Sequence, residues 1–157
     1  MRTLAWHETL ELGELIASQA HCLAKFKMVL PQIQDPELRS LYEFSIGALQ
    51  GNLQELLGFL SSVEPARGGD MMPSITDSFY AGDLLGAAKT AVRNYAIAIT
   101  ETATPELREI FLKQLNAAVR WHEKVFTYMA QRGLYPAYDL GKLLQVDVTL
   151  AQNAINM

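Results

Sequence analysis

Apolar side chains recur along most of this chain at intervals of three, four and seven residues. That spacing places them on one face of an α-helix. Pro is absent from the interiors of these stretches and gathers with Gly between them, where helices end. The pattern predicts four long helices and a short helical extension, over residues 4–30, 35–62, 78–102, 105–132 and 134–157 respectively.

Two of the predicted helices begin alike. Asp35 and Thr104 are each followed by Pro-Glu-Leu-Arg, and the two copies lie 69 residues apart. A capping side chain followed by Pro is a typical helix start. At the same offset the apolar positions coincide, which favours two helical hairpins of similar design. A chance recurrence of a good helix start is the alternative.

The connections between the helices differ in length. Short loops join the first helix to the second and the third to the fourth, and short loops make antiparallel neighbours. Residues 63–77 are longer and rich in Gly and Pro; at ~3.3 Å per residue they could reach along a whole helix. We therefore predict an all-α, ferritin-like four-helix bundle of two antiparallel hairpins with a long crossover, forming a single domain over residues 1–157.

Composition narrows the functional classes. The chain has 157 residues, half of them hydrophobic, and a net charge of −4. Without a basic patch, a nucleic-acid role has little support. The first residues contain no long apolar run, so we expect neither a signal peptide nor a membrane span. Cys22 is the lone cysteine and cannot form an internal disulfide.

A di-iron bundle requires Glu-x-x-His on two of its helices, and no Glu of this sequence has a His three residues later. The predicted core stripes instead carry neutral polar residues, which are poor iron ligands. We expect a structural hydrogen-bonding network, with Asn94 buried and bonded across helices; a decayed metal centre is the alternative. The residues concerned are Gln19, Ser45, Asn52, Asn94 and Gln114.

Two His-Glu pairs, which begin at His7 and at His122, also suggest a metal-binding site. Adjacent helical residues point about 100° apart and cannot readily chelate one ion together. We therefore predict that His122 packs and forms hydrogen bonds. A weak divalent-ion site at His7, Glu11 and Glu14, near His21, competes with a plain solvated acidic face. No catalytic, cofactor-binding or metal-binding residue is assigned, and no cofactor is expected.

The run from Tyr80 to Tyr138 resembles the spore coat protein F family of endospore-forming bacteria. The resemblance rests on Lys89, Asn94-Tyr95, Glu101-Thr102, Thr104-Pro105, Arg108, Leu115, His122-Glu123, Tyr128-Met129, Gly133 and Tyr135-Pro136. It implies a ferritin-like bundle and a place in the spore coat, after synthesis in the cytoplasm of the sporulating cell. It implies no catalytic residues, and it implies other coat proteins as partners.

These observations favour a non-catalytic structural coat protein that is not an enzyme. The alternative is a metal-binding or oxidoreductase member of the ferritin-like class. A carrier of a small ligand on the alanine-lined side of the third helix is a further possibility. A homo-oligomer is also possible, because Gly47, Ala48 and Gly51 form a small-residue face where another helix could approach.

Overall fold

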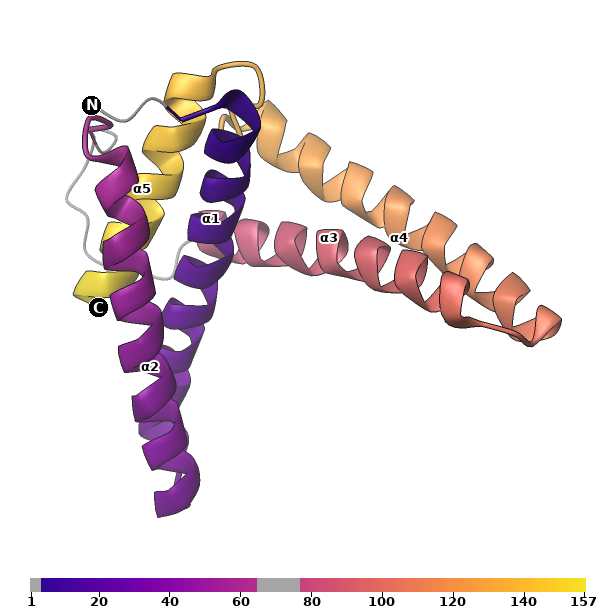
Figure 1. The fold of residues 1–157 in the computed structure, drawn as a ribbon, viewed down its shortest axis with the longest axis horizontal. Coiled ribbons are helices and arrows are strands. Elements are labelled where there is room, and N and C mark those ends of the chain that lie inside the picture. The colour runs from indigo at the N-terminus through magenta and orange to yellow at the C-terminus, as the bar shows by residue number, and fades with distance from the viewer. Residues whose placement is uncertain (1–3, 65–76) are drawn as a thin grey trace. The chain divides into compact units, whose positions relative to one another are not determined.

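The computed structural model describes residues 4–64 and 77–157, and over these residues it contains helices and turns but no strand. The helices are α1 (Trp6–Val29), α2 (Pro36–Leu57), α3 (Asp77–Glu101), α4 (Pro105–Gln131) and α5 (Leu140–Asn156) (Figure 1). Short 3-10 turns follow the first two: η1 (Leu30–Gln32) and η2 (Gly58–Leu60). The all-α prediction is confirmed. None of the described helices is long and apolar enough to cross a membrane.

The chain divides into two compact units. One contains α1, α2 and α5, and the other is the antiparallel hairpin of α3 and α4. The predicted crossover, residues 63–77, lies mostly outside the described residues. The ferritin-like arrangement of the four long helices in one domain therefore stays a prediction.

The repeated Pro-Glu-Leu-Arg motif has the same structural role in both hairpins. Pro36 and Pro105 occupy the first helical positions of α2 and α4. The Arg39 guanidinium donates a hydrogen bond to the Leu30 carbonyl at the end of the preceding helix, and Arg108 donates to the Thr102 carbonyl. Carbonyls at a helix C-terminus have no partner within the helix, so each arginine closes the turn that it follows.

Three helices build the core of the first unit. Its largest fully buried side chains are Ile16 and Leu23 of α1 and Leu53 of α2. The C-terminal extension that the sequence predicted forms α5, which packs on α1 and α2 (Figure 1). Asp147 is buried in the middle of this one continuous helix.

The second unit has a smaller core near the open end of the hairpin. Ala81 and Leu85 of α3 meet Val125 and Met129 of α4. Partly buried Phe126, Leu134 and Tyr135 pack against this cluster. Nearer the connecting loop, the rings of Tyr95 and Phe111 lie 6.2 Å apart.

Gly133 turns the chain back onto this core. Its φ is +68°, in the left-handed region. The Gly133 N–H donates to the Ala130 carbonyl at 3.2 Å, and the Leu134 N–H donates to the Met129 carbonyl at 2.9 Å. These two bonds form a Schellman cap. Gly133 is therefore the C-terminal cap residue of α4.

Gly133→Ala should lower the free energy of unfolding by about 1–2 kcal/mol, because a side chain disfavours the left-handed conformation by that amount. No neighbouring atom lies within 4 Å of the added Cβ, so the loss comes from the backbone alone. Urea unfolding of both proteins measures it. Gly133→Asn should lose less, since Asn tolerates this conformation better; an equal loss would contradict the conformational explanation.

Candidate functional site

An aromatic cluster lies at the open end of the hairpin and includes His122. The half-buried His122 ring stacks on Phe126 with 6.2 Å between centroids and 15° between planes. Phe126 meets Tyr135 edge-on at 5.6 Å, and the Lys89 ammonium lies 5.5 Å from the Tyr135 ring centroid. We refer to His122, Phe126, Tyr135 and Lys89 as the aromatic cluster. It joins α3, α4 and the segment after Gly133.

The aromatic cluster confirms that His122 is a packing residue, whereas its predicted hydrogen bond stays a prediction. A stacked imidazole contributes contact area to Phe126, and the cation over the Tyr135 ring adds electrostatic attraction. Glu123, its neighbour in sequence, is exposed. The contacts of the aromatic cluster stabilise the packing of α3, α4 and the segment after Gly133 against one another.

The predicted polar network forms only in part. The Asn52 amide donates to the Gln19 side-chain oxygen at 3.1 Å, which links α2 to α1. Ser45 donates to the Leu41 carbonyl at 2.8 Å, within its own helix. Asn94 and Gln114 are exposed, so the prediction of a buried Asn94 was wrong. Tyr95 points at α4, and its neighbour Asn94 is rotated about 100° away from that contact.

The acidic face of α1 does not form the metal constellation that the sequence left open as an alternative. His7 and Glu11 are exposed, and His21 places Nδ1 2.8 Å from the Ala17 carbonyl of its own helix. Within residues 4–64 and 77–157, no group of three or more His, Cys, Asp or Glu side chains is placed to hold a metal ion. Cys22 is a half-buried free thiol.

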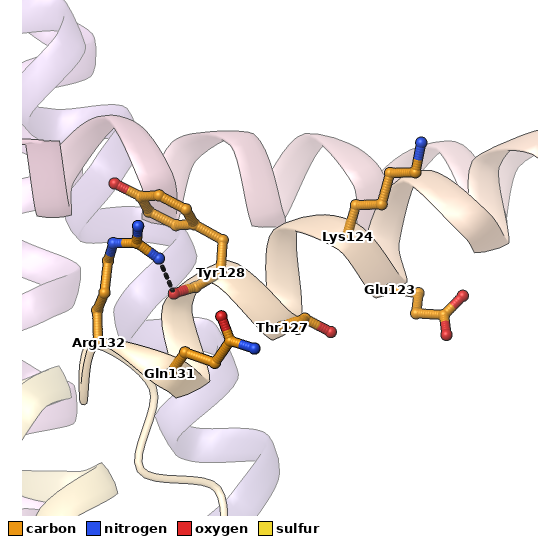
Figure 2. Close-up of a pocket in the computed structure, with 6 residues that line it drawn as sticks. All are labelled: Glu123, Lys124, Thr127, Tyr128, Gln131 and Arg132. Carbon is orange, nitrogen blue, oxygen red and sulfur yellow. Dashed lines mark hydrogen bonds between the residues drawn. The ribbon is translucent and has the colours of Figure 1, made fainter.

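An open depression of about 470 Å³ lies along α4. Figure 2 shows the Arg132 side chain beside the Tyr128 ring, with a hydrogen bond from the guanidinium to the Tyr128 carbonyl. The Arg132 guanidinium carbon is 3.9 Å from the ring centroid. The lining residues all belong to one helix or its C-terminal cap, so the depression does not enclose a ligand. They are Glu123, Lys124, Thr127, Tyr128, Gln131 and Arg132.

A buried carboxylate was not expected from the sequence. Asp147 of α5 is only 8% exposed and faces Gly13 of α1. A Cβ on Gly13 would lie 2.7 Å from the Asp147 Oδ2, closer than two such atoms can approach. Gly13 therefore provides the space for this carboxylate at the α1–α5 contact.

Lys27 and Gln50 hold the other end of α5. The Lys27 ammonium donates to the carbonyls of Ala154 and Ile155, at 2.8 and 2.7 Å. The Gln50 amide adds a 3.3 Å bond to the Ile155 carbonyl. A cation at a helix C-terminus satisfies free carbonyls and interacts favourably with the helix dipole. Side chains of α1 and α2 thus fix the last turn of α5.

Lys27→Met should lower the free energy of unfolding at neutral pH by about 1–2 kcal/mol, the cost of leaving such carbonyls without these donors. Burial lowers the pKa of Lys27 below its ordinary 10.5. At pH values between the lowered pKa of the folded state and the ordinary pKa, Lys27 binds more protons in the unfolded chain than in the folded one. The free energy of unfolding of the wild type should therefore increase as pH rises through that window. Chemical denaturation at several pH values should show this gain in the wild type. A gain of the same size in Lys27→Met would contradict its assignment to Lys27.

Comparison with known proteins adds two matches. Residues 76–138, nearly the same stretch as the α3–α4 unit, match the model of the Coat F domain. The chain is also 36% identical over 86 residues to the spore coat protein F-like protein YraD of Bacillus subtilis (strain 168). That alignment covers 55% of this chain and 87% of the relative. No solved structure matched the chain.

Proposed function

The chain belongs to the spore coat protein F family, and on that premise we propose that it is a non-catalytic structural component of the spore coat. The observation that carries the proposal is the 36% identity to a spore coat protein F-like protein across most of that protein's length. Its place of action is the coat, and its partners are other coat proteins.

The roles of the chemically capable side chains support a structural function. His122 contributes its ring to the aromatic cluster, and Lys27 holds the backbone of α5. Asn52 and Gln19 join two helices. Lys27, Asn52 and Gln19 connect one helix to another, and His122 packs on Phe126 within α4, as expected of a protein with a structural role.

The runner-up is a metal-binding or oxidoreductase member of the ferritin-like class. It differs from the proposal in one measurable property, bound metal. The chain should be purified without chelator and without nickel affinity resin, then dialysed and analysed for iron, manganese and zinc. The structural role predicts far less than one ion per chain. One or more retained ions per chain would overturn the non-catalytic assignment and favour the runner-up.

A further inference from the structure

We draw no further inference here: the strongest candidate, the surface patch of apolar residues on the α3–α4 hairpin that includes Leu84, Leu107 and Ile110, carries none, because nothing in the structure shows what covers it.

Discussion

Leu23→Ala should lower the free energy of unfolding of the α1–α2–α5 unit by about 2–5 kcal/mol, the range for removing a large aliphatic side chain from a rigid core. Leu23 has no exposed surface, and α1 contributes it to the core shared with α2 and α5. The truncation leaves a cavity that surrounding helices fill only in part. Denaturant unfolding followed by circular dichroism measures the loss.

Leu10→Ala is the matched control for Leu23, since the residue type and the helix are the same. Leu10 is exposed, so its truncation should cost well under about 1 kcal/mol. Similar losses for the two variants would mean that α1 does not use the side we describe as its core face.

Gly13→Ala should destabilise the same unit, although Ala is the better helix former by about 1 kcal/mol. The added Cβ would meet the Asp147 Oδ2 at 2.7 Å, and a buried carboxylate has little room to move. Overpacking a well-filled contact costs about 1–3 kcal/mol, which exceeds the gain in helix propensity over most of that range. Thermal and denaturant unfolding should both show the loss.

One altered background and one control variant isolate the contact at Gly13. In an Asp147→Ala background the same Gly13→Ala change should become stabilising, because the opposing carboxylate is gone. Gly47→Ala, on α2, should stabilise the wild type directly, because nothing lies within 4 Å of its added Cβ. Losses at Gly13 that persist without Asp147 would show that another neighbour sets the limit.

Local signals in the sequence were sufficient for the helices and their starts. Periodic apolar positions indicated all four long helices, and Asp35-Pro36 and Thr104-Pro105 marked two of their starts correctly. A Gly just after the last periodic residue of a helix is likewise a local signal of a C-terminal cap, and Gly133 has the left-handed conformation that such a cap requires. Each of these features depends on a few consecutive residues, so no knowledge of distant contacts was needed.

The sequence did not predict contacts between segments that lie far apart along the chain. Lys27 meets carbonyls of Ala154 and Ile155, and backbone carbonyls leave no trace in residue identity. Gly13 of α1 lies opposite Asp147 of α5, and no local pattern links two residues so far apart in the sequence. The prediction for Asn94 was wrong for a related reason: it was assigned to the core stripe of α3, but the side of α3 that faces α4 is decided by a contact between helices.

Fractionation of spores tests the central claim, a structural place in the coat, most directly. The chain, carrying a small epitope tag, would be produced during sporulation in Bacillus subtilis, the organism of the relative. Purified spores would be extracted with detergent and reducing agent to separate the coat from the decoated spore. We expect the tagged chain in the coat extract, and we expect it to resist removal by salt washing of intact spores. Recovery from the decoated spore or the mother-cell lysate instead would contradict the claim.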